Sequence, residues 1–434
     1  MNTRYALCGL SNRGISHFAR PLLGTAGPAD DYSATSRLVA LIDTDEARAR
    51  QFLEKQAPNA YDAPTWFAPA DFDAMVDATR PDVVLVASPD RTHVDYILAA
   101  LRRGLDVVTE KPMTSTAADA ARVLEAEAKS AGKVRVTHNM RYTSRHRQIR
   151  RLIQSGAIGD VTHASLDYHV DISHGASYFL RWNRQRANSG GLSIHKSSHH
   201  LDLMNWLIGD LPRTVFAFGA LNYYGPNGAN RPPLAAHATA AELRALDPYY
   251  LAQRGTGVFP DDGSVDRPGA YGLSYPGQYP AGQDLYLYDA EIDIEDTYSS
   301  VIQYRRGASL AYSIDFSSPW EGYVLGISGT RGRIEADFGK DVDGRPRRDE
   351  DVLTYYPLFG EPQQHRIGKS GGDHDGSDAL LRRNIFGGGI PESDELSLKA
   401  TTLDGAYAVA AGEAMWRSVA TGLPIDVDSL LGAH

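Results

Sequence analysis

Hydrophobic residues in the first 140 positions fall into short β-branched runs that alternate with segments of helical periodicity. The run Asp82–Ala87, DVVLVA, is apolar almost throughout, which is typical of a strand covered on both faces. Similar runs predict further strands at Tyr5–Gly9, Leu38–Asp43, Asp106–Thr109 and Val134–His138. Helices are expected between them, for example at His93–Arg103 and Thr116–Ser130. Strands that alternate with helices predict a doubly wound parallel sheet, an α/β arrangement.

The pattern changes after residue 145, where strands follow one another through short glycine-containing turns. Such strands are predicted at 161–170, 294–304, 308–316, 323–328 and 333–338. Helices are predicted at 146–155, 196–208, 377–384 and 397–419. We therefore expect a doubly wound domain over residues 1–140 and an α/β domain with an open, mostly antiparallel sheet over 141–434. A stretch at about 222–290, rich in Gly, Pro, Tyr and Ala, is expected as a long insert.

Composition excludes several classes of protein. The 434 residues are 42% hydrophobic and 23% charged, as in ordinary globular chains of two or three domains. Cys8 is the single cysteine, which excludes a disulfide scaffold and fits a reducing compartment. The formal charge of −10 makes non-specific nucleic-acid binding unexpected. Because no apolar run approaches ~18 residues and no signal segment is recognisable, we expect no membrane span and a cytoplasmic location.

A glycine-containing turn follows the first predicted strand. It reads Gly9-Leu10-Ser11-Asn12-Arg13-Gly14 and has the spacing of a phosphate-binding turn, with serine in place of the middle glycine. Glycines let the backbone turn tightly and approach a pyrophosphate at a helix N-terminus. We therefore expect Gly9, Ser11, Asn12, Arg13 and Gly14 to contact a dinucleotide. An ordinary strand-to-helix turn is the alternative.

Polar residues at the ends of two further strands are candidates for the same cofactor. Asp43 ends the second strand, where its carboxylate can accept hydrogen bonds from both ribose hydroxyls and repel a 2′-phosphate. This favours NAD over NADP, although Asp43 could instead cap a helix. Ser88 and Pro89 follow the strand 82–87 at the carboxyl edge of the sheet, where ligands of such folds bind. His93 either lies near the cofactor or is only a first-turn helix residue.

Several motifs together resemble one known family. They are Tyr96-Ile97…Gly104 ahead of Thr109-Glu110-Lys111-Pro112, Gly156 to Gly159, Gly190-Gly191 through Asp202, Ser328 to Glu335, and the late TGLPIDV. Over most of its length the chain resembles the glucose–fructose oxidoreductase / inositol dehydrogenase / rhizopine-catabolism (Gfo/Idh/MocA) family. The resemblance implies a Rossmann domain followed by an α/β domain with a large open sheet. It also implies NAD(P) use and oxidation or reduction of a sugar or cyclitol carbon.

The resemblance also implies roles for individual residues. The family's lysine maps onto Lys111, next to Glu110, and both are expected at the cofactor. Its catalytic histidine maps onto His199, and Asp202 ends the pattern. This sequence departs from the common form, because His195 replaces an aspartate and Ser197 replaces a glycine. In such a site His199 would take the hydroxyl proton and Lys111 would stabilise the developing alkoxide.

The spacing around the histidines allows more than one interpretation. His195, His199 and Asp202 fall on one helix face, so Asp202 could contact substrate or orient His199. The same spacing of His195 and His199 suits a metal, with His174 and His200 as further ligands. The sequence lacks the glutamate of a zinc-protease site, so we expect no metal.

A mixed aromatic and polar segment precedes this helix. Its residues His174, Tyr178 and Arg181 suit a sugar site, where rings stack on C–H faces and polar groups bind hydroxyls. A structured surface loop is the alternative.

These observations lead to three hypotheses. The first is an NAD-dependent oxidoreductase that acts on a secondary hydroxyl of a sugar or glycoside. The second is a glycosidase that keeps its NAD and works by transient oxidation, elimination and re-reduction, because the extra histidines provide a second base. The third is a non-catalytic NAD-binding regulator, which an intact Lys111 and His199 argue against. The open sheet needs cover, so we expect a homo-oligomer, a dimer or a tetramer.

Overall fold

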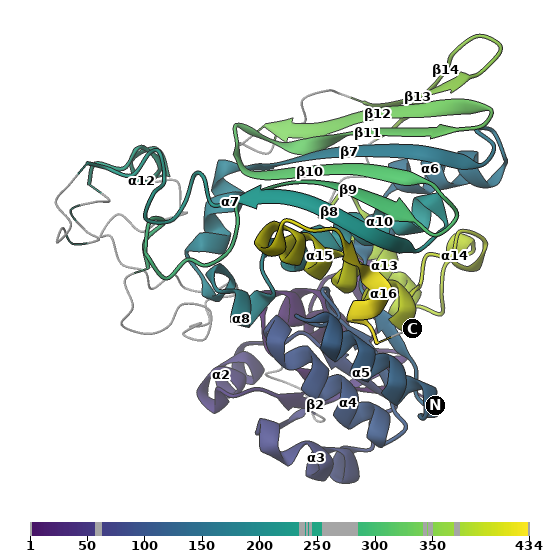
Figure 1. Cartoon of the computed structure of the whole chain (residues 1–434). Coiled ribbons are helices and arrows are strands. Elements are labelled where there is room, and N and C mark those ends of the chain that lie inside the picture. Colours follow the sequence, from purple (N-terminus) through teal and green to yellow (C-terminus); the bar gives the residue numbers. More distant parts are fainter. Residues whose placement is uncertain are drawn as a thin grey trace.

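Two β-sheets organise the computed structural model, and several helices lie in the layer between them (Figure 1). The structure describes residues 2–56, 63–233, 239, 242, 245–253, 285–341, 345, 350–368 and 374–432. Most of the expected insert at 222–290 therefore lies outside the described residues. No helix in the described part of the chain is both long and apolar enough to cross a membrane.

The first sheet is the doubly wound sheet expected from the sequence. Its strand order is β15-β6-β5-β4-β1-β2-β3, and all of its strands except β15 run parallel. Its strands are β1 (Thr3–Cys8), β2 (Ser36–Ile42), β3 (Thr65–Phe67), β4 (Val83–Val86), β5 (Asp106–Thr109), β6 (Val134–Val136) and β15 (Ala400–Thr401). The α-helices of this part are α1 (Arg20–Leu22), α2 (Glu46–Gln56), α3 (Phe72–Thr79), α4 (His93–Arg102) and α5 (Ala117–Ala128). The apolar residues Tyr5–Cys8 of β1 and Val84–Val86 of β4 are buried, as expected for strands covered on both faces.

The second sheet has nine strands in the order β14-β13-β12-β11-β7-β10-β9-β8-β16. Only β7 and β10 pair in parallel; the other neighbours are antiparallel. Its strands are β7 (Val161–Asp171), β8 (Pro212–Ala220), β9 (Thr297–Tyr304), β10 (Ser309–Ser318), β11 (Trp320–Gly329), β12 (Gly332–Asp341), β13 (Asp351–Pro357), β14 (Gln363–Ile367) and β16 (Ile425–Asp426). The expected fold class, a doubly wound domain followed by a domain with a large, mostly antiparallel sheet, is confirmed.

The remaining helices belong to the second half of the chain. They are α6 (Ser144–Gln154), α7 (Ile172–Phe179), α8 (Arg186–Ser189), α9 (Leu192–His195), α10 (Ser197–Ile208), α12 (Pro248–Gln253), α13 (Ser377–Phe386), α14 (Glu392–Glu395), α15 (Thr402–Thr421) and α16 (Val427–Leu430). Short 3₁₀ turns are η2 (Pro28–Asp30), η3 (Pro69–Asp71), η4 (Asp90–Thr92), η5 (Asn139–Tyr142) and η6 (Trp182–Arg184), and η1 (Gly14–Ala19) is a π-helix. The helix expected at 196–208 corresponds to α10, and the short helix α9 precedes it across Lys196.

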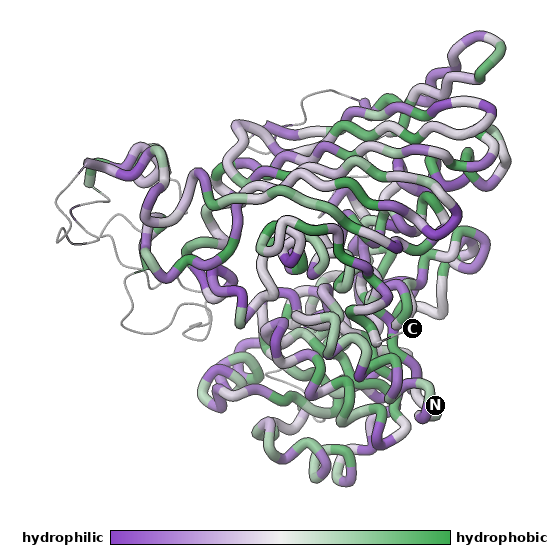
Figure 2. Tube along the Cα trace, in the orientation of Figure 1, coloured by the Kyte–Doolittle hydropathy of each residue, from purple (hydrophilic) through white to green (hydrophobic). Residues whose placement is uncertain are grey.

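The two sheets differ in the pattern of hydrophobic and hydrophilic residues along their strands. Strands of the second sheet alternate between hydrophobic and hydrophilic positions, whereas the parallel sheet below carries longer hydrophobic stretches (Figure 2). In β9 every second residue is buried, from Tyr298 to Tyr304, and the residues between them are largely exposed. One face of this sheet therefore packs on the helix layer and the other faces outward.

The chain returns to the first domain near its end. β15 extends the parallel sheet beside β6, and α13 packs on the core of that domain. Phe386, 5% exposed, contacts the edge of Tyr5 with ring centroids 5.2 Å apart and lies 6.3 Å from Phe18. The first domain is thus completed by residues from the far end of the sequence.

We predict that Phe386→Ala loosens this attachment. Truncating a buried phenylalanine costs about 3–5 kcal/mol of stability because contacts are lost and a cavity remains. Urea unfolding followed by circular dichroism should show an earlier transition. Phe359→Ala is the matched control, since Phe359 is 89% exposed and its loss should leave the transition unchanged. Equal midpoints for Phe386→Ala and the unchanged chain would contradict the packing described above.

Candidate active site

The glycine turn forms a tight cradle at the carboxyl end of β1. Gly9 has φ +96°, and a Cβ on it would lie 2.6 Å from the Ser88 Cα. A Cβ on Gly14 would lie 2.4 Å from the Gly9 carbonyl oxygen. Neither position therefore admits a side chain. The helix that starts here leaves its first backbone N–H groups without intrahelical acceptors, which is the arrangement that binds a pyrophosphate.

The polar residues of the turn are engaged within it. Ser11 Oγ accepts a hydrogen bond from the N–H of Gly14 at 3.0 Å. The serine that stands in place of the motif's middle glycine therefore stabilises the turn. Asp43 Oδ2 accepts the N–H of Leu10 at 2.7 Å, and its Oδ1 accepts the N–H of Asp45 at 2.9 Å. Burial raises the pKa of Asp43. The structure thus places Asp43 beside the turn, with lone pairs left over for further donors.

His93 was expected near the cofactor, but its ring contacts two backbone carbonyl groups. Its ring is 1% exposed, with Nδ1 2.9 Å from the Pro112 carbonyl oxygen and Nε2 2.8 Å from that of Ser88. Both ring nitrogens are occupied by backbone, so His93 is corrected from a cofactor ligand to a brace. It joins the loop of Ser88 and Pro89 to the loop of Lys111.

Lys111 lies at the carboxyl end of β5, where the two domains meet. Its Nζ donates to the His195 carbonyl oxygen at 3.4 Å. Burial and the nearby ammonium of Lys196 lower the pKa of Lys111 to about 8, while Asp90 and Glu110 oppose this shift. A lysine with a pKa near neutrality can change its charge at working pH.

His195 is held by a residue of the other domain. Its Nδ1 lies 2.5 Å from Asp90 Oδ2, and its Nε2 lies 3.2 Å from the amide nitrogen of Asn183. Burial lowers the pKa of His195, although Asp90 favours the charged ring. Asp90 follows Pro89 directly, so the carboxyl edge of the parallel sheet contacts the histidine segment of the second domain.

His199 lies in the first turn of α10, and one of its ring nitrogens has no hydrogen-bond partner within the described part of the chain. Its Nδ1 is buried and has no hydrogen-bond partner among the residues described. Burial and the ammonium of Lys111 hold the pKa of His199 well below its ordinary value, which keeps the imidazole neutral and able to accept a proton. His138 packs edge-on against it with ring centroids 6.1 Å apart.

Asp202 does not reach His199 or an open site, which corrects the expectation from spacing. Its carboxylate is 1% exposed and binds Arg141 through two hydrogen bonds, Nε–Oδ2 at 2.8 Å and Nη2–Oδ1 at 2.5 Å. Arg141 is itself fully buried, so its charge requires this partner. Asp202 is therefore a structural counter-ion.

A second cluster of titratable groups lies on the sheet side of the histidine segment. His174 Nδ1 is 2.9 Å from Glu321 Oε2, and its Nε2 is 2.8 Å from the Tyr178 hydroxyl. Lys196 Nζ lies 3.7 Å from Glu321 Oε1. Burial would raise the pKa of Glu321, but Lys196 and His174 outweigh it and hold that pKa low. The Tyr178 ring also meets His195 edge-on at 5.4 Å, which connects the two groups.

Arg181 and His200 both bind within their own surroundings. The Arg181 guanidinium donates to the Ser177 carbonyl oxygen at 2.6 Å and lies over the Tyr178 ring. His200 is fully buried, stacks on Tyr168 and lies 2.8 Å from the Tyr312 hydroxyl. Among the described residues, no three histidine, cysteine or acidic side chains converge as a metal site would require.

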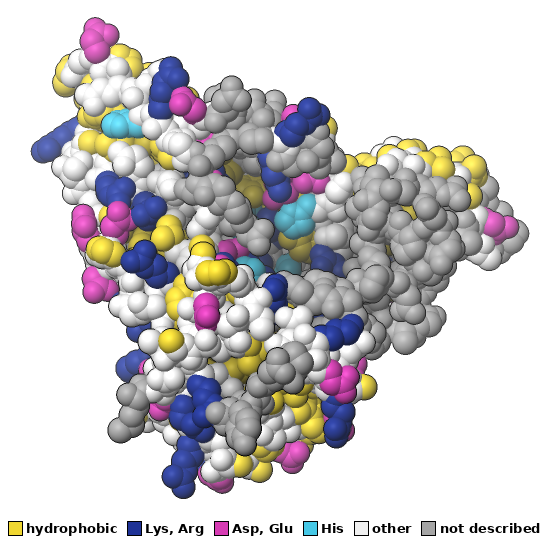
Figure 3. Space-filling model, turned by 180° about the vertical axis from the view of Figure 1, so that it is seen from behind, with side chains coloured by type: hydrophobic (Ala, Val, Ile, Leu, Met, Phe, Trp, Pro, Cys, Tyr) yellow, Lys and Arg dark blue, Asp and Glu magenta, His cyan; other side chains and the backbone are white. Residues whose placement is uncertain are grey.

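Sequence reasoning brought Lys111, His195 and His199 together but missed their neighbours. Missed residues around them are Asp90, His138, Asn183, Lys196 and Glu321. Lys196 stands inside the histidine run and could have been noticed there; Glu321 gave a weaker signal, a single carboxylate at the start of an apolar strand. From behind, histidine side chains with acidic and basic neighbours gather at a hollow between the upper and lower parts (Figure 3).

Comparison with known proteins agrees with this architecture. A sequence model described as "Oxidoreductase family, NAD-binding Rossmann fold" matches residues 3–138, and one described as "Oxidoreductase family, C-terminal alpha/beta domain" matches residues 150–427. The chain is 42% identical over 429 residues to "Putative oxidoreductase YteT" of Bacillus subtilis (strain 168), covering 98% of this chain and 97% of that one.

More distant matches also extend over most of the chain. Inositol 2-dehydrogenase of Streptomyces avermitilis is 25% identical over 357 residues, which cover 79% of this chain and 95% of that enzyme. A structure of levoglucosan dehydrogenase with NADH and levoglucosan superposes with a TM-score of 0.63 at 16% identity, over 98% of this chain and 100% of that one. The fold and the two family matches, which together span most of the sequence, establish that the chain belongs to the Gfo/Idh/MocA family of oxidoreductases.

Proposed function

We propose that the protein transfers a hydride between a secondary hydroxyl of a sugar or glycoside and a nicotinamide cofactor. The observation that carries this proposal is the meeting of Lys111, from the nucleotide domain, with the histidine segment 195–199 of the second domain. The named relatives, inositol 2-dehydrogenase and levoglucosan dehydrogenase, act on a cyclitol and a sugar. When bound, the nicotinamide supplies the hydride acceptor or donor.

The protein's own residues would accept the hydroxyl proton and stabilise the negative charge that develops on the oxygen. His199 is neutral because burial and Lys111 disfavour its charged form, so the ring nitrogen that has no partner among the described residues would accept the hydroxyl proton. The Lys111 ammonium stabilises negative charge that develops on the same oxygen. The His195–Asp90 pair lies beside them and would bind a neighbouring hydroxyl. His174, Tyr178 and Arg181 would complete the sugar site on the other side.

We further propose NAD rather than NADP as the cofactor. The glycine cradle would hold the pyrophosphate through the backbone of Ser11, Asn12 and Arg13. Asp43 stands beside the turn with unused lone pairs, which suit ribose hydroxyls and repel a 2′-phosphate. Ser88 lies against this cradle, since a Cβ on Gly9 would meet its backbone, and Pro89, the next residue, would contact the cofactor from the same loop.

A second candidate function is supported by the number of proton-transfer groups. The site contains two imidazole–carboxylate pairs, His195–Asp90 and His174–Glu321, in addition to His199. Hydride transfer alone needs one base. Transient oxidation of a sugar carbon acidifies the adjacent C–H, so a second base could remove that proton and expel an aglycone; water addition and re-reduction would then complete a hydrolysis without net oxidation.

Self-association through the outward face of the second sheet is also proposed. Phe218, Val301 and Val324 are 70%, 57% and 49% exposed on strands β8, β9 and β11. Exposed apolar side chains on a broad sheet mark an interaction surface. A homo-oligomer, a dimer or a tetramer, would cover them.

The proposed function is tested with the purified chain and a panel of compounds. Free sugars, myo-inositol, levoglucosan and nitrophenyl glycosides are each incubated with NAD or NADP, and both reduced cofactor and product are measured. Net formation of NADH from a sugar or glycoside supports the dehydrogenase. Product release without net NADH supports the glycosidase. If Lys111→Ala retains the full activity of the unchanged chain, both the dehydrogenase and the glycosidase hypotheses are contradicted.

The rate should depend on pH through Lys111. Its pKa of about 8 lies below the ordinary lysine value, so the stabilising ammonium is present below pH 8 and is lost above it. We expect kcat/KM for an active compound to fall as pH rises through about 8, by up to tenfold per unit. His199 is already neutral near pH 7, so no matching acid limb is expected there. Lys111→Arg keeps its charge and should lose the alkaline fall; a flat profile for the unchanged chain would refute this role.

A further inference from the structure

One buried carboxylate of the second domain contacts the glycine turn. We propose that Asp378, the second residue of α13, is a positioning residue for the dinucleotide site: through Arg13 it holds the turn in the form that accepts a pyrophosphate. The inference rests on the proposed cofactor use. It assigns a role in cofactor binding to a residue that lies far from the turn in sequence.

Asp378 is 1% exposed, and four side-chain nitrogens lie close to its carboxylate. Its Oδ2 lies 3.2 Å from Arg13 Nη1, 3.0 Å from His17 Nε2 and 2.6 Å from His374 Nδ1. Its Oδ1 accepts from the Asn139 amide at 2.8 Å. Burial would raise the pKa of Asp378, but these contacts hold it well below its ordinary value. The group is therefore a permanent, compensated negative charge.

Two of the four nitrogens come from the segment in which the glycine turn leads into η1. Arg13 is the residue before η1, and His17 lies within that π-helix. Their side chains also contact each other, with Arg13 Nη1 2.7 Å from His17 Nε2. π-helical segments are rare and often mark functional sites. Asp378 thus fixes the start of the helix at which a pyrophosphate would bind.

Arg13 also connects Asp378 to the loop that contains Glu110 and Lys111. Its Nε and Nη2 lie 3.3 Å and 3.2 Å from Glu110 Oε1, and Glu110 immediately precedes Lys111. The planar guanidinium therefore bridges two carboxylates, one from each domain. The bridge joins the phosphate cradle, the lysine loop and α13 in one network.

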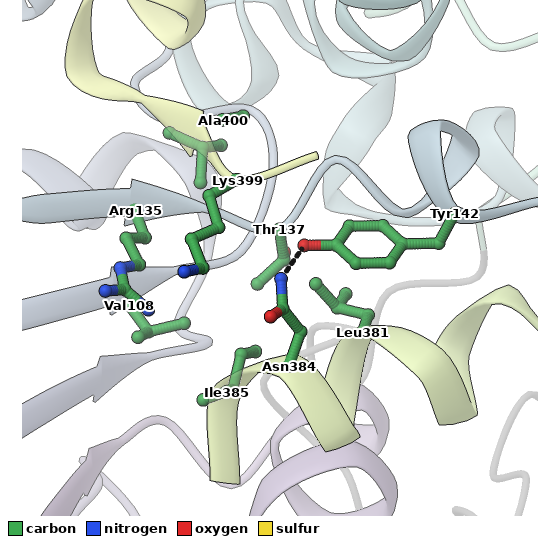
Figure 4. A pocket seen from close by; sticks show the side chains of 10 residues that line it. Val108, Arg135, Thr137, Tyr142, Leu381, Asn384, Ile385, Lys399 and Ala400 are labelled. Carbon is green, nitrogen blue, oxygen red and sulfur yellow. Dashed lines mark hydrogen bonds between the residues drawn. The ribbon is translucent and has the colours of Figure 1, made fainter. Parts of the chain in front are cut away.

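Helix α13 is itself held firmly against the first domain, so it can serve as a fixed support. Leu381, Asn384 and Ile385 face the ends of β5 and β6, and Asn384 donates to the Tyr142 hydroxyl at 2.7 Å (Figure 4). Phe386 fills the aromatic cluster of that domain. A rigid support keeps a binding loop in its bound form, which reduces the entropic cost of binding.

The test measures NADH affinity by the fluorescence of the bound cofactor. Asp378→Asn keeps the shape of the side chain but removes the charge that holds Arg13, so the dissociation constant for NADH should rise at least fivefold. Asp375→Asn is the matched control: Asp375 lies three residues earlier and pairs with Arg145 at 3.0 Å, away from Arg13. Its dissociation constant should stay within twofold of the unchanged chain.

Arg13→Lys separates positioning from a direct contact with phosphate. A lysine still binds phosphate as a point charge, but it cannot bridge two carboxylates. We expect Arg13→Lys to weaken NADH binding at least fivefold and the double variant with Asp378→Asn to be no weaker than either single one, within twofold. Arg13→Lys alone carries the test if Asp378→Asn does not fold, with circular dichroism as the check.

Three results would overturn the inference. They are NADH binding by Asp378→Asn or Arg13→Lys within twofold of the unchanged chain, tighter binding by Asp378→Asn, and effects that multiply in the double variant. Tighter binding would mean that Asp378 acts by its charge on the phosphates. If the unchanged chain binds neither NADH nor NADPH, the proposed function itself fails, which is a separate outcome.

Discussion

The buried ammonium of Lys111 is the constraint on which the arrangement of the surrounding residues depends. Lys111 emerges from the parallel sheet where α9 and α10 of the second domain cover it, and burial brings its pKa to about 8. Asp90 and Glu110 offset part of that cost. Such a marginally stable charge would suit the role proposed for Lys111, the stabilisation of a developing alkoxide. The histidines around it are neutral for the same reason.

The two domains cannot be separated without dismantling this site. Lys111, Asp90 and Glu110 come from the nucleotide domain, while His195 and His199 come from the second. Residues late in the chain then return to the first domain, through β15 and α13. Ion pairs as well as apolar contacts connect the two domains, as with Arg13 and the buried Asp378. Such pairs add little stability but fix geometry, since breaking one leaves an uncompensated charge.

Local sequence patterns were enough for β1, β2, β4, β5 and β6 of the first sheet and for the glycine turn, because these features depend on neighbouring residues, but the short strands β3 and β15 were missed. The resemblance to a family supplied Lys111 and His199. Strand β13 and the edge strand β14 were missed, since partly exposed strands lack a continuous apolar run. Asp202 was misjudged because helical spacing gives the face of a side chain but not its partner. That partner, Arg141, lies 61 positions away.

Asp378 and Glu321 could not be assigned from sequence for a related reason. Each is a single carboxylate whose role depends on donors brought together by the fold, and Arg13 is 365 positions from Asp378. Charge patterning along the chain therefore says little about the buried network. Only the tertiary arrangement shows that these acids face bases rather than water.

The most direct measurement is a crystal structure of the protein with NAD and an unreactive analogue of an active sugar. The account predicts Lys111 Nζ and a ring nitrogen of His199 both within about 3.2 Å of one analogue oxygen, beside the nicotinamide ring. An analogue oxygen that contacts only one of the two, or side chains that point into separate cavities, would contradict it.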